Sequence, residues 1–244
     1  YKSNFTDGFP TDCPHREKLG WTGDAWIASE LAQCYFENTA AYRKWLTDVM
    51  DTQTAKGSLC GICPTSGWGF AWGNGPVFDA VLAMLPWNLW LFRGDRIALE
   101  AAYPALLRYL DCEQALETEP GLVANGLDDW NAKEASHKPA AEYVISCLRL
   151  EIVETAAKIA EALGKTADAA RHRAAGERIR TALRAKYAKG NGVFDNGGQT
   201  AQALAVACRL AAPDERQATA DRLADSVLKT DCHADFGLAG AKYV

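Results

Sequence analysis

Apolar residues recur along most of this chain at intervals of three and four positions, the spacing that places them on one face of an α-helix. This periodicity predicts eight helices, over residues 25–37, 39–52, 77–92, 96–117, 139–163, 166–187, 200–210 and 214–228. No stretch makes a convincing strand of alternating apolar and polar residues. The pattern therefore predicts an all-α chain built from paired helices.

Short and long connections alternate between the predicted helices. Gly164-Lys165 joins two of them so tightly that they must run antiparallel. Residues 54–76 and 118–137 form long loops, and loops of that length in a compact chain usually serve a function. This alternation would suit a toroid of helical hairpins, in which a cleft forms at the end with the longer loops, but the pattern alone indicates only paired helices.

The helix predicted over residues 77–92 is apolar nearly all round, which indicates an inner helix that is buried on most sides. Pro86 is expected to kink or break this helix, because proline lacks the amide hydrogen that a helix interior needs. Asp95 should cap the next helix, which Pro104 could interrupt.

The composition limits the classes of partner. With 244 residues, 48% of them hydrophobic, the chain can bury the core of one globular domain. A net charge of −5 and the lack of a Lys/Arg cluster argue against nucleic-acid binding, which needs concentrated cations. No run approaches the ~20 apolar residues that cross a bilayer, so no membrane partner is predicted. Neutral or weakly charged ligands fit this composition better.

Eight cysteines are scattered along the chain, mostly within apolar helical patterns, and are predicted to be reduced. Cys60 and Cys63 form the only close pair, but zinc would need a second pair of ligands, so we expect no metal and no cofactor. His137 and His172 are expected to be ordinary surface residues. Reduced cysteines and the lack of a visible secretory leader favour a cytoplasmic location, which the sequence leaves open.

The candidate chemistry is concentrated in residues 11–24, which read Thr-Asp-Cys-Pro-His-Arg-Glu-Lys-Leu-Gly-Trp-Thr-Gly-Asp. Pro14 and two glycines prevent a regular element, so this segment should be a loop that leads into the first helix. It carries acids together with a cation and an aromatic ring, which are Asp12, Glu17, Asp24, Arg16 and Trp21.

Two interpretations of this loop stay open. Asp24 could simply cap the first helix, and Asp12 could cap a turn. Arg16 and Glu17 could form a solvated ion pair. Alternatively, an aromatic face surrounded by carboxylates is what a sugar site requires, with one acid available for proton transfer.

The two long loops carry aromatic residues that are open to a similar choice. Trp68, Phe70 and Trp72 could stack on sugar faces or fold back as a small apolar plug, and the sequence favours neither. In the second loop, two adjacent acids and a tryptophan could cap turns or face a ligand, namely Asp128, Asp129 and Trp130.

Residues 7–24 closely resemble the signature of the bacterial α-L-rhamnosidases of glycoside hydrolase family 78, which runs Pro-Thr-Asp-Cys-Pro-x-Arg-(Asp)-Glu-x-x-Gly-Trp-x-(Gly-Asp). Further matches follow in the family's order, at Phe78-Asp79-Ala80, Pro86-Trp87, Gly94-Asp95, Asp128-Asp129-Trp130, Gln199-Thr200, Ala203-Leu204, and His233 with Gly237 and Gly240. Asp128 stands where the family usually has glycine. The resemblance spans nearly the whole chain.

The resemblance implies a six-hairpin α/α toroid, of which residues 1–244 would form an incomplete part. It also implies N-terminal β-domains and the remainder of the toroid outside this stretch. The implied activity is inverting hydrolysis of terminal non-reducing α-L-rhamnose, so the expected partner is a rhamnose-containing glycoside or oligosaccharide. Another inverting glycosidase on the same scaffold and a non-catalytic carbohydrate-binding module remain alternatives.

The resemblance also implies roles for single residues. Glu17 aligns with the family's general acid, and the positions expected around the sugar are Asp12, Arg16, Trp21, Asp24, Trp72, Asp79, Asp129, Trp130 and His233. The family's general base is a glutamate that would follow Val244, so no residue here is assigned to it. We expect Asp12 and Asp24 to raise the pKa of Glu17 by like-charge repulsion, and Arg16 to oppose that rise.

Overall fold

The computed structural model describes residues 1–6, 8–65, 67, 69–72, 74–132 and 137–244. Its helices are α1 (Thr22–Tyr35), α2 (Thr39–Asp51), α3 (Pro76–Asp79), α4 (Val81–Arg93), α5 (Arg96–Ala115), α6 (Ala141–Ala162), α7 (Thr166–Tyr187), α8 (Gln199–Ala207) and α9 (Arg216–Lys229). Every predicted helix is present, with ends within about one turn of the prediction. The mainly helical class is therefore confirmed.

Two short antiparallel hairpins of strands also occur in the described part of the chain. β1 (Phe5–Thr6) pairs with β2 (Phe9–Pro10), and β3 (Ala188–Gly190) pairs with β4 (Val193–Phe194). The prediction of no strand is wrong at these places. Strands of two or three residues are too short to show an alternating pattern, so the sequence carries no periodic signal for them.

The helix predicted over residues 77–92 is divided at Ala80 into α3 and α4, and not at Pro86 as expected. α3 is a single turn in which the carboxylate of Asp79 accepts from the Gly75 amide at 2.8 Å. The Gly75 amide lies at the N-terminal end of α3, where amides have no partner within the helix. The carboxylate of Asp79 supplies that partner and so stabilises the turn. α4 continues through Pro86.

The neighbouring helices agree with the sequence in most respects. Oδ1 of Asp95 accepts from the Ala98 amide at 3.3 Å, so the predicted cap of α5 is confirmed. α5 runs through Pro104 without interruption. α4 is buried over most of its length, but its last turn is not, since Leu91 is 61% exposed and Phe92 is 40% exposed.

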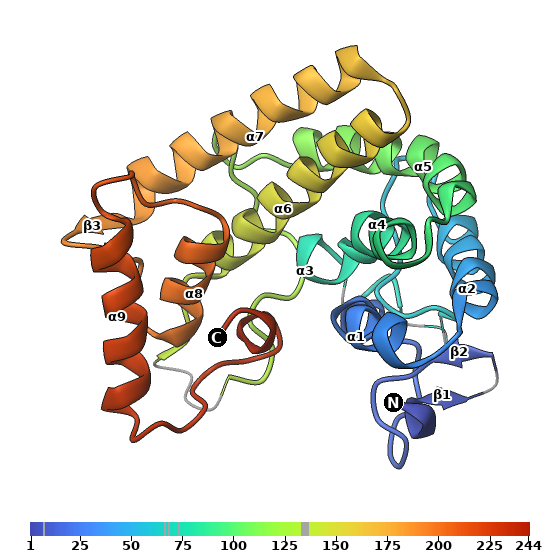
Figure 1. Ribbon diagram of the computed structural model, residues 1–244, viewed down its shortest axis with the longest axis horizontal. Coiled ribbons are helices and arrows are strands. Elements are labelled where there is room, and N and C mark those ends of the chain that lie inside the picture. The colour runs from blue at the N-terminus through green and yellow to red at the C-terminus, as the bar shows by residue number, and fades with distance from the viewer. Residues whose placement is uncertain (7, 66, 68, 73, 133–136) are drawn as a thin grey trace.

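The helices are arranged in antiparallel pairs and a cluster around α4 (Figure 1). α6 and α7 form a long hairpin along one edge, where Gly164 turns the chain with a φ of +76°. The predicted antiparallel course of these two helices is confirmed. α8 and α9 form a second pair, whereas α4 packs against α1, α2, α5 and α6. The C-terminal segment returns to the middle of the molecule beside α8.

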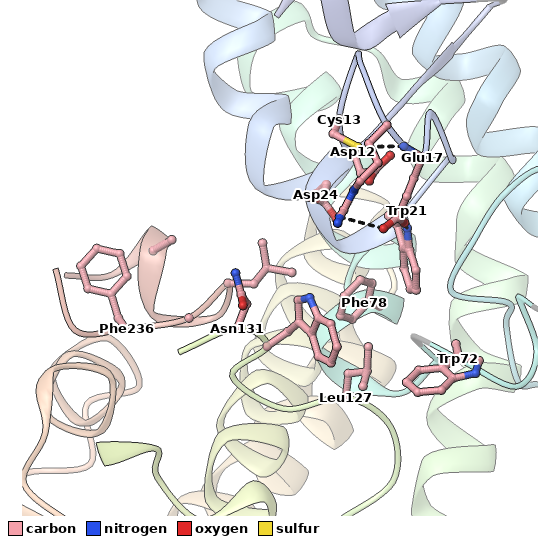
Figure 2. Close-up of a pocket in the computed structure, with 15 residues that line it drawn as sticks. Asp12, Cys13, Glu17, Trp21, Asp24, Trp72, Phe78, Leu127, Asn131 and Phe236 are labelled. Carbon is pink, nitrogen blue, oxygen red and sulfur yellow. Dashed lines mark hydrogen bonds and ion pairs between the residues drawn. The ribbon is translucent and has the colours of Figure 1, made fainter. Parts of the chain in front are cut away.

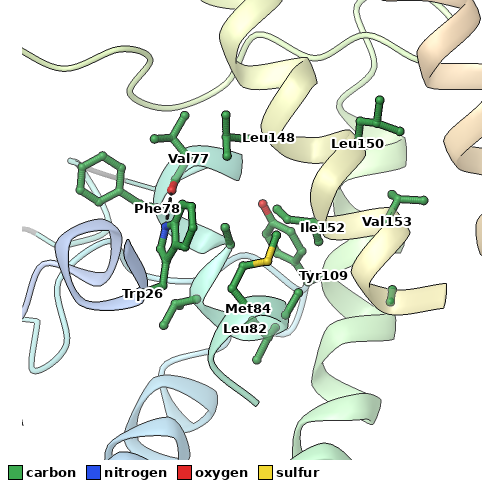
Figure 3. Packing of buried hydrophobic residues seen from close by; sticks show 14 of the residues in the cluster. Trp26, Val77, Phe78, Leu82, Met84, Tyr109, Leu148, Leu150, Ile152 and Val153 are labelled. Atoms are coloured by element: carbon green, nitrogen blue, oxygen red, sulfur yellow. Dashed lines mark hydrogen bonds between the residues drawn. The ribbon is translucent and has the colours of Figure 1, made fainter. Parts of the chain in front are cut away.

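The hydrophobic core lies beneath α3 and joins helices that are distant in sequence (Figure 3). Trp26 of α1 is buried, and its indole N–H donates to the Val77 carbonyl at 2.8 Å. Leu82 of α4, Tyr109 of α5 and Ile152 of α6 are buried in the same cluster. α3 itself therefore rests on a closely packed core.

His172 is buried and not at the surface, so the prediction for this residue is wrong. It is 5% exposed, and its Nε2 lies 3.4 Å from the hydroxyl of Tyr103, which α5 contributes. Burial lowers the pKa of His172, because the charged imidazolium loses its hydration. Because α7 carries many exposed arginines, its sequence looked like that of a surface helix, and the buried position of His172 was not predicted. His137, by contrast, is exposed and contacts Asp235 at 2.7 Å.

All eight cysteines are unpaired, as predicted, and Cys60 and Cys63 are buried. Among the described residues, no three His, Cys, Asp or Glu side chains form a group that could hold a metal ion. A search of the same residues finds no helix with the length and apolarity that crossing a membrane requires.

Candidate active site

Residues 11–21 form an irregular loop, as predicted, which its own hydrogen bonds close. The Asp12 amide donates to the Leu19 carbonyl at 2.9 Å, and the Leu19 amide donates back to Asp12 Oδ1 at 3.0 Å. Lys18 lies in the left-handed region, with a φ of +56°, where the chain turns back. One carboxylate oxygen of Asp12 therefore closes a turn, and the turn carries Arg16 and Glu17.

The loop is attached to the segment around residues 61–63. The Cys63 amide donates to the Gly20 carbonyl at 2.8 Å, and the Thr22 amide donates to the Gly61 carbonyl at 2.9 Å. A Cβ atom at Gly20 would lie 2.0 Å from the Cys63 carbonyl oxygen, so only glycine fits here. These bonds fix the position at which α1 begins. They therefore also fix the direction of Trp21, which directly precedes α1.

α1 begins at Thr22, so Asp24 lies inside its first turn and does not cap it. The interpretation of Asp24 as a helix cap is therefore wrong. Burial raises the pKa of Asp24 to about 6, and the nearby carboxylates of Asp12 and Glu17 add to the rise. The expected effect of these acids on Glu17 itself stays a prediction.

Both carboxylate oxygens of Glu17 accept hydrogen bonds. The guanidinium of Arg16 donates to Oε1 at 2.9 Å, and the indole N–H of Trp21 donates to Oε2 at 3.0 Å. The side chain of Arg16 is 74% exposed, so the predicted solvated ion pair is present. Trp21 in turn packs against Phe78 of α3, with ring centroids 5.5 Å apart. Glu17 is thus oriented by its neighbours at an open surface.

These side chains form one wall of a cavity of about 540 Å³ (Figure 2). The loop and α1 contribute Asp12, Cys13, Arg16, Glu17, Trp21 and Asp24. The other lining residues are Trp72, Phe78, Leu127, Trp130, Asn131, Phe236, Gly237, Leu238 and Ala241. In Figure 2 the acids and Trp21 lie on one side, Trp72 and Leu127 lie on the facing side, and Phe236 closes a third side.

The described aromatic residues of the two long loops, Phe70, Trp72 and Trp130, are exposed and not folded back. Trp72 is 48% exposed and Trp130 is 50% exposed, and both line the cavity. Phe70 is 47% exposed but is not a lining residue. For Phe70 and Trp72, the interpretation as a buried apolar plug is therefore wrong. Trp68 lies outside the described residues, and its predicted role stays a prediction.

Three of the residues expected around a sugar do not line this cavity. Asp79 is 2% exposed and binds the Gly75 amide, whereas His233 is exposed and its Nδ1 lies 3.0 Å from the Thr230 carbonyl oxygen. Asp129 is fully buried and accepts bonds from other parts of the chain, namely Thr200 Oγ1 at 2.6 Å and the amides of Gly237 and Gly240 at 3.0 Å each. We therefore do not propose these three residues as sugar contacts.

Residues 1–244 match the family described as the bacterial α-L-rhamnosidase six-hairpin glycosidase domain. The chain belongs to this family.

Curated relatives and solved structures agree with this family over nearly the whole chain. The α-L-rhamnosidase of Streptomyces avermitilis is 32% identical over 241 residues, which are 95% of this chain and 22% of that protein. One of Formosa agariphila is 25% identical, over 98% of this chain and 26% of that protein. The chain thus spans about a quarter of the length of these relatives.

Two solved structures show the same fold. The crystal structure of the Streptomyces avermitilis α-L-rhamnosidase complexed with L-rhamnose matches with a TM-score of 0.88 and 30% identity, over 98% of this chain and 23% of that one. The native α-L-rhamnosidase of Aspergillus terreus matches with a TM-score of 0.89 and 25% identity, over 98% of this chain and 29% of that one.

Several cavity residues of this family member were missed by the sequence analysis. Phe78 lies inside the matched motif Phe78-Asp79-Ala80, and Phe236 stands beside the motif position Gly237, so the motif matches were the available signal. Leu127 and Asn131 lie in the second long loop, next to the Asp128 motif, but nothing in their residue types pointed to a site. Cys13 lies inside the signature itself.

Proposed function

We propose that the complete protein containing residues 1–244 hydrolyses terminal α-L-rhamnosides, with Glu17 as general acid. The observation that carries this proposal is the cavity. Its acidic wall holds Asp12, Glu17 and Asp24, and the facing side, called here the aromatic wall, holds Trp72 and Leu127. Carboxylates accept bonds from sugar hydroxyls, and exposed indoles stack on the apolar faces of sugar rings. The names of the relatives, and the L-rhamnose in one solved relative, support the choice of sugar.

In this proposal the residues of the acidic wall have different roles in proton transfer and in sugar binding. Glu17 protonates the leaving glycosidic oxygen, because it is the acid on the exposed turn and points into the cavity beside Trp21. Asp24, with a pKa of about 6, holds a sugar hydroxyl near the start of α1. Asp12 and Arg16 bind further hydroxyls, and Trp21, Trp72 and Trp130 form stacking surfaces.

The reaction is proposed to invert the anomeric centre, which requires a general base on the face of the sugar opposite to the acid. Among the described residues that line the cavity, all the carboxylates come from the segment between Asp12 and Asp24. They lie on the side of the acid. We therefore propose that the base is contributed by a residue outside residues 1–244.

Glu17→Gln in the complete protein tests the role of the acid. Cleavage of an alkyl α-L-rhamnoside should fall by about 10²–10⁴-fold, because its leaving group must be protonated. Cleavage of 2,4-dinitrophenyl α-L-rhamnoside should fall far less, since that leaving group departs without a proton. Asp24→Asn is the matched control, because a lost hydroxyl contact should slow both substrates alike. Equal losses of both substrates in Glu17→Gln would contradict the assignment.

The wild-type protein separates the remaining possibilities. Proton NMR of the first product should show β-L-rhamnose before it mutarotates, and an initial α-anomer would overturn inversion. Binding of L-rhamnose without cleavage of either substrate would favour a carbohydrate-binding module. Cleavage of another glycoside instead would favour a different glycosidase on the same scaffold.

A further inference from the structure

A buried polar cluster lies beneath the two loops that form the aromatic wall. It consists of Asp79 of α3, Tyr109 and Glu113 of α5, Arg149 of α6, and Asn125 of the second long loop. Asp79 and Glu113 are each 2% exposed. Two buried carboxyl groups are costly to keep, because each loses its hydration. The hydrogen bonds of Asp79 and Glu113 show which parts of the two loops these carboxyl groups hold in place.

The first bond runs to the loop that carries Trp72. Oδ2 of Asp79 accepts from the amide of Gly75 at 2.8 Å, and Gly75 follows Trp72 at the end of the loop. Gly75 has a φ of +101°, a conformation that glycine adopts without strain. Asp79 thus fixes the position of Gly75, three residues after Trp72.

The second bond runs to the loop that carries Leu127. Oε1 of Glu113 accepts from the side-chain amide of Asn125 at 2.9 Å. Asn125 is followed closely by Leu127, which lines the cavity. Glu113 thus fixes the position of Asn125, two residues before Leu127.

The two loops also touch each other directly above the cluster. A Cβ atom on Gly126 would lie 1.9 Å from the Asn74 carbonyl oxygen, and one on Gly75 would lie 2.3 Å from the Asn125 carbonyl oxygen. The backbones are therefore in direct contact at these two glycines. A shift of either loop must move the other, so the two carboxyl groups hold one combined structure.

We propose that Asp79 and Glu113 are positioning residues, which set the location of Trp72 and Leu127 in the wall that receives the sugar ring. This inference rests on the proposed function, because it concerns the same cavity. Neither carboxyl group touches the sugar. Each acts through a loop: Asp79 through Gly75, and Glu113 through Asn125.

The charged neighbours of Glu113 allow a pH-dependent readout. Burial raises its pKa to about 7, although the bond from Asn125 and the charge of Arg149 oppose the rise. The other titratable groups near Glu113 are Asp79 and Tyr109. The thiols of Cys112, in α5, and Cys60 also lie near the cluster. Glu113 therefore changes charge near neutral pH, whereas Glu113→Gln keeps the acceptor oxygen and cannot ionise.

The test compares Glu113→Ala and Glu113→Gln in the complete protein. Calorimetry gives the Kd for L-rhamnose, and hydrogen exchange gives the protection of peptides around Trp72 and Leu127. Glu113→Ala should raise the Kd about tenfold and speed exchange in both peptides, because the bond to Asn125 is lost. Glu113→Gln should stay within about twofold of the wild type and lose the part of any affinity change that centres near pH 7, while the part that Asp24 causes near pH 6 remains.

Tyr103→Phe is the matched control. Tyr103 also belongs to α5, but its hydroxyl donates to Asp168 of α7 at 2.9 Å, away from the cavity. This variant should lower the melting temperature without changing the Kd or the exchange of the two peptides. Asn125→Ala removes the same bond from the loop side, and it replaces Glu113→Ala if that variant does not fold.

The possible outcomes separate this inference from the proposed function. If the wild type binds L-rhamnose and neither Glu113→Ala nor Asn125→Ala alters the Kd or the exchange, the positioning role is overturned while the function stands. Equal effects of Tyr103→Phe on both readouts would overturn it as well. If the wild type binds no L-rhamnose but both variants speed exchange in both peptides, the loop positioning stands and the choice of sugar fails.

Discussion

Burial controls the acid–base behaviour of single residues in and beneath the cavity. Asp24 has its pKa raised to about 6 in the cavity wall, and Glu113 has its pKa raised to about 7 below it. In both cases removal from water is the largest cause, and neighbouring charges modify it. Both carboxyl groups therefore change charge within the range of pH in which enzymes are usually assayed.

Asp24→Asn should change how stability depends on pH. In the folded protein Asp24 holds its proton up to about pH 6, but in the unfolded chain it loses it near its ordinary pKa of about 3.8. Between these values the folded state binds more protons, so the free energy of unfolding falls as pH rises, by about 3 kcal/mol in total for this group. The variant should lose this decline and be the more stable protein above pH 6.

Melting temperatures measured from pH 4 to 8 would check this prediction. The difference between wild type and Asp24→Asn should grow up to about pH 6 and then stay constant. Asp225→Asn removes a carboxylate from a half-exposed ion pair of α9 and serves as the control for the loss of a charge elsewhere. A difference that is constant over the whole range would show that Asp24 is not the group responsible.

At the scale of elements, long periodic helices were predictable and short elements were not. The periodic positions of α5, α6 and α7 lie against other helices, so their pattern of apolar residues reflects burial directly. α1 starts earlier than its apolar pattern because the segment at residues 61–63 binds Gly20 and Thr22. The start of α3 is fixed by Asp79, whose carboxylate accepts from the Gly75 amide. These bonds join partners that the linear pattern does not relate.

Gly20→Ala should disturb the element that carries the acids. The new Cβ would lie 2.0 Å from the Cys63 carbonyl oxygen, so the loop must move away from its support. We expect a loss of roughly 3 kcal/mol in the free energy of unfolding and a weaker affinity for L-rhamnose. Denaturant unfolding and calorimetry on the complete protein would measure both.

Gly164→Ala offers a control in the turn between α6 and α7. Gly164 has a φ of +76°, and a methyl group added there would meet no atom within 4 Å, so the cost is backbone strain of about 1 kcal/mol. Sugar affinity should stay unchanged in this variant. If Gly20→Ala also left sugar affinity unchanged, the link between the loop's support and the cavity would be wrong.

At the scale of the whole molecule, the cavity depends on segments from both ends of the chain. Residues near Asp12 form one wall, and residues 236–241 form another. The C-terminal segment is held by Asp129 and by the Leu238 amide, which donates to the Trp130 carbonyl at 2.8 Å. Lys242 also contacts Glu30 of α1 at 2.8 Å. The last residues thus connect α1, the second long loop and α8.

Asp129→Ala should therefore release the C-terminal wall. It would leave the amides of Gly237 and Gly240 and the hydroxyl of Thr200 without their acceptor, at a cost of about 1–3 kcal/mol for each group that stays buried. We expect a loss of at least about 3 kcal/mol in stability and faster hydrogen exchange over residues 236–244.

Asp128→Ala is the control for this change, since the side chain of Asp128 forms a partly exposed ion pair with Lys138. That variant should cost about 1 kcal/mol or less. Thermal unfolding together with hydrogen exchange would distinguish the two. Similar losses in both variants would mean that Asp129 does not anchor the C-terminal segment.

The sequence by itself determined the helical class, the approximate ends of the long helices, the loop that carries Asp12 and Glu17 just before α1, and the family. These features are local, because apolar spacing and motif wording depend on residues that are close together in the chain. The tertiary structure alone decided that Phe78 lines the cavity while Asp79 is buried behind it, and that Trp130 lines the cavity while Asp129 is buried. The physical reason is that the orientation of neighbouring side chains depends on which distant segments pack against each side of the backbone.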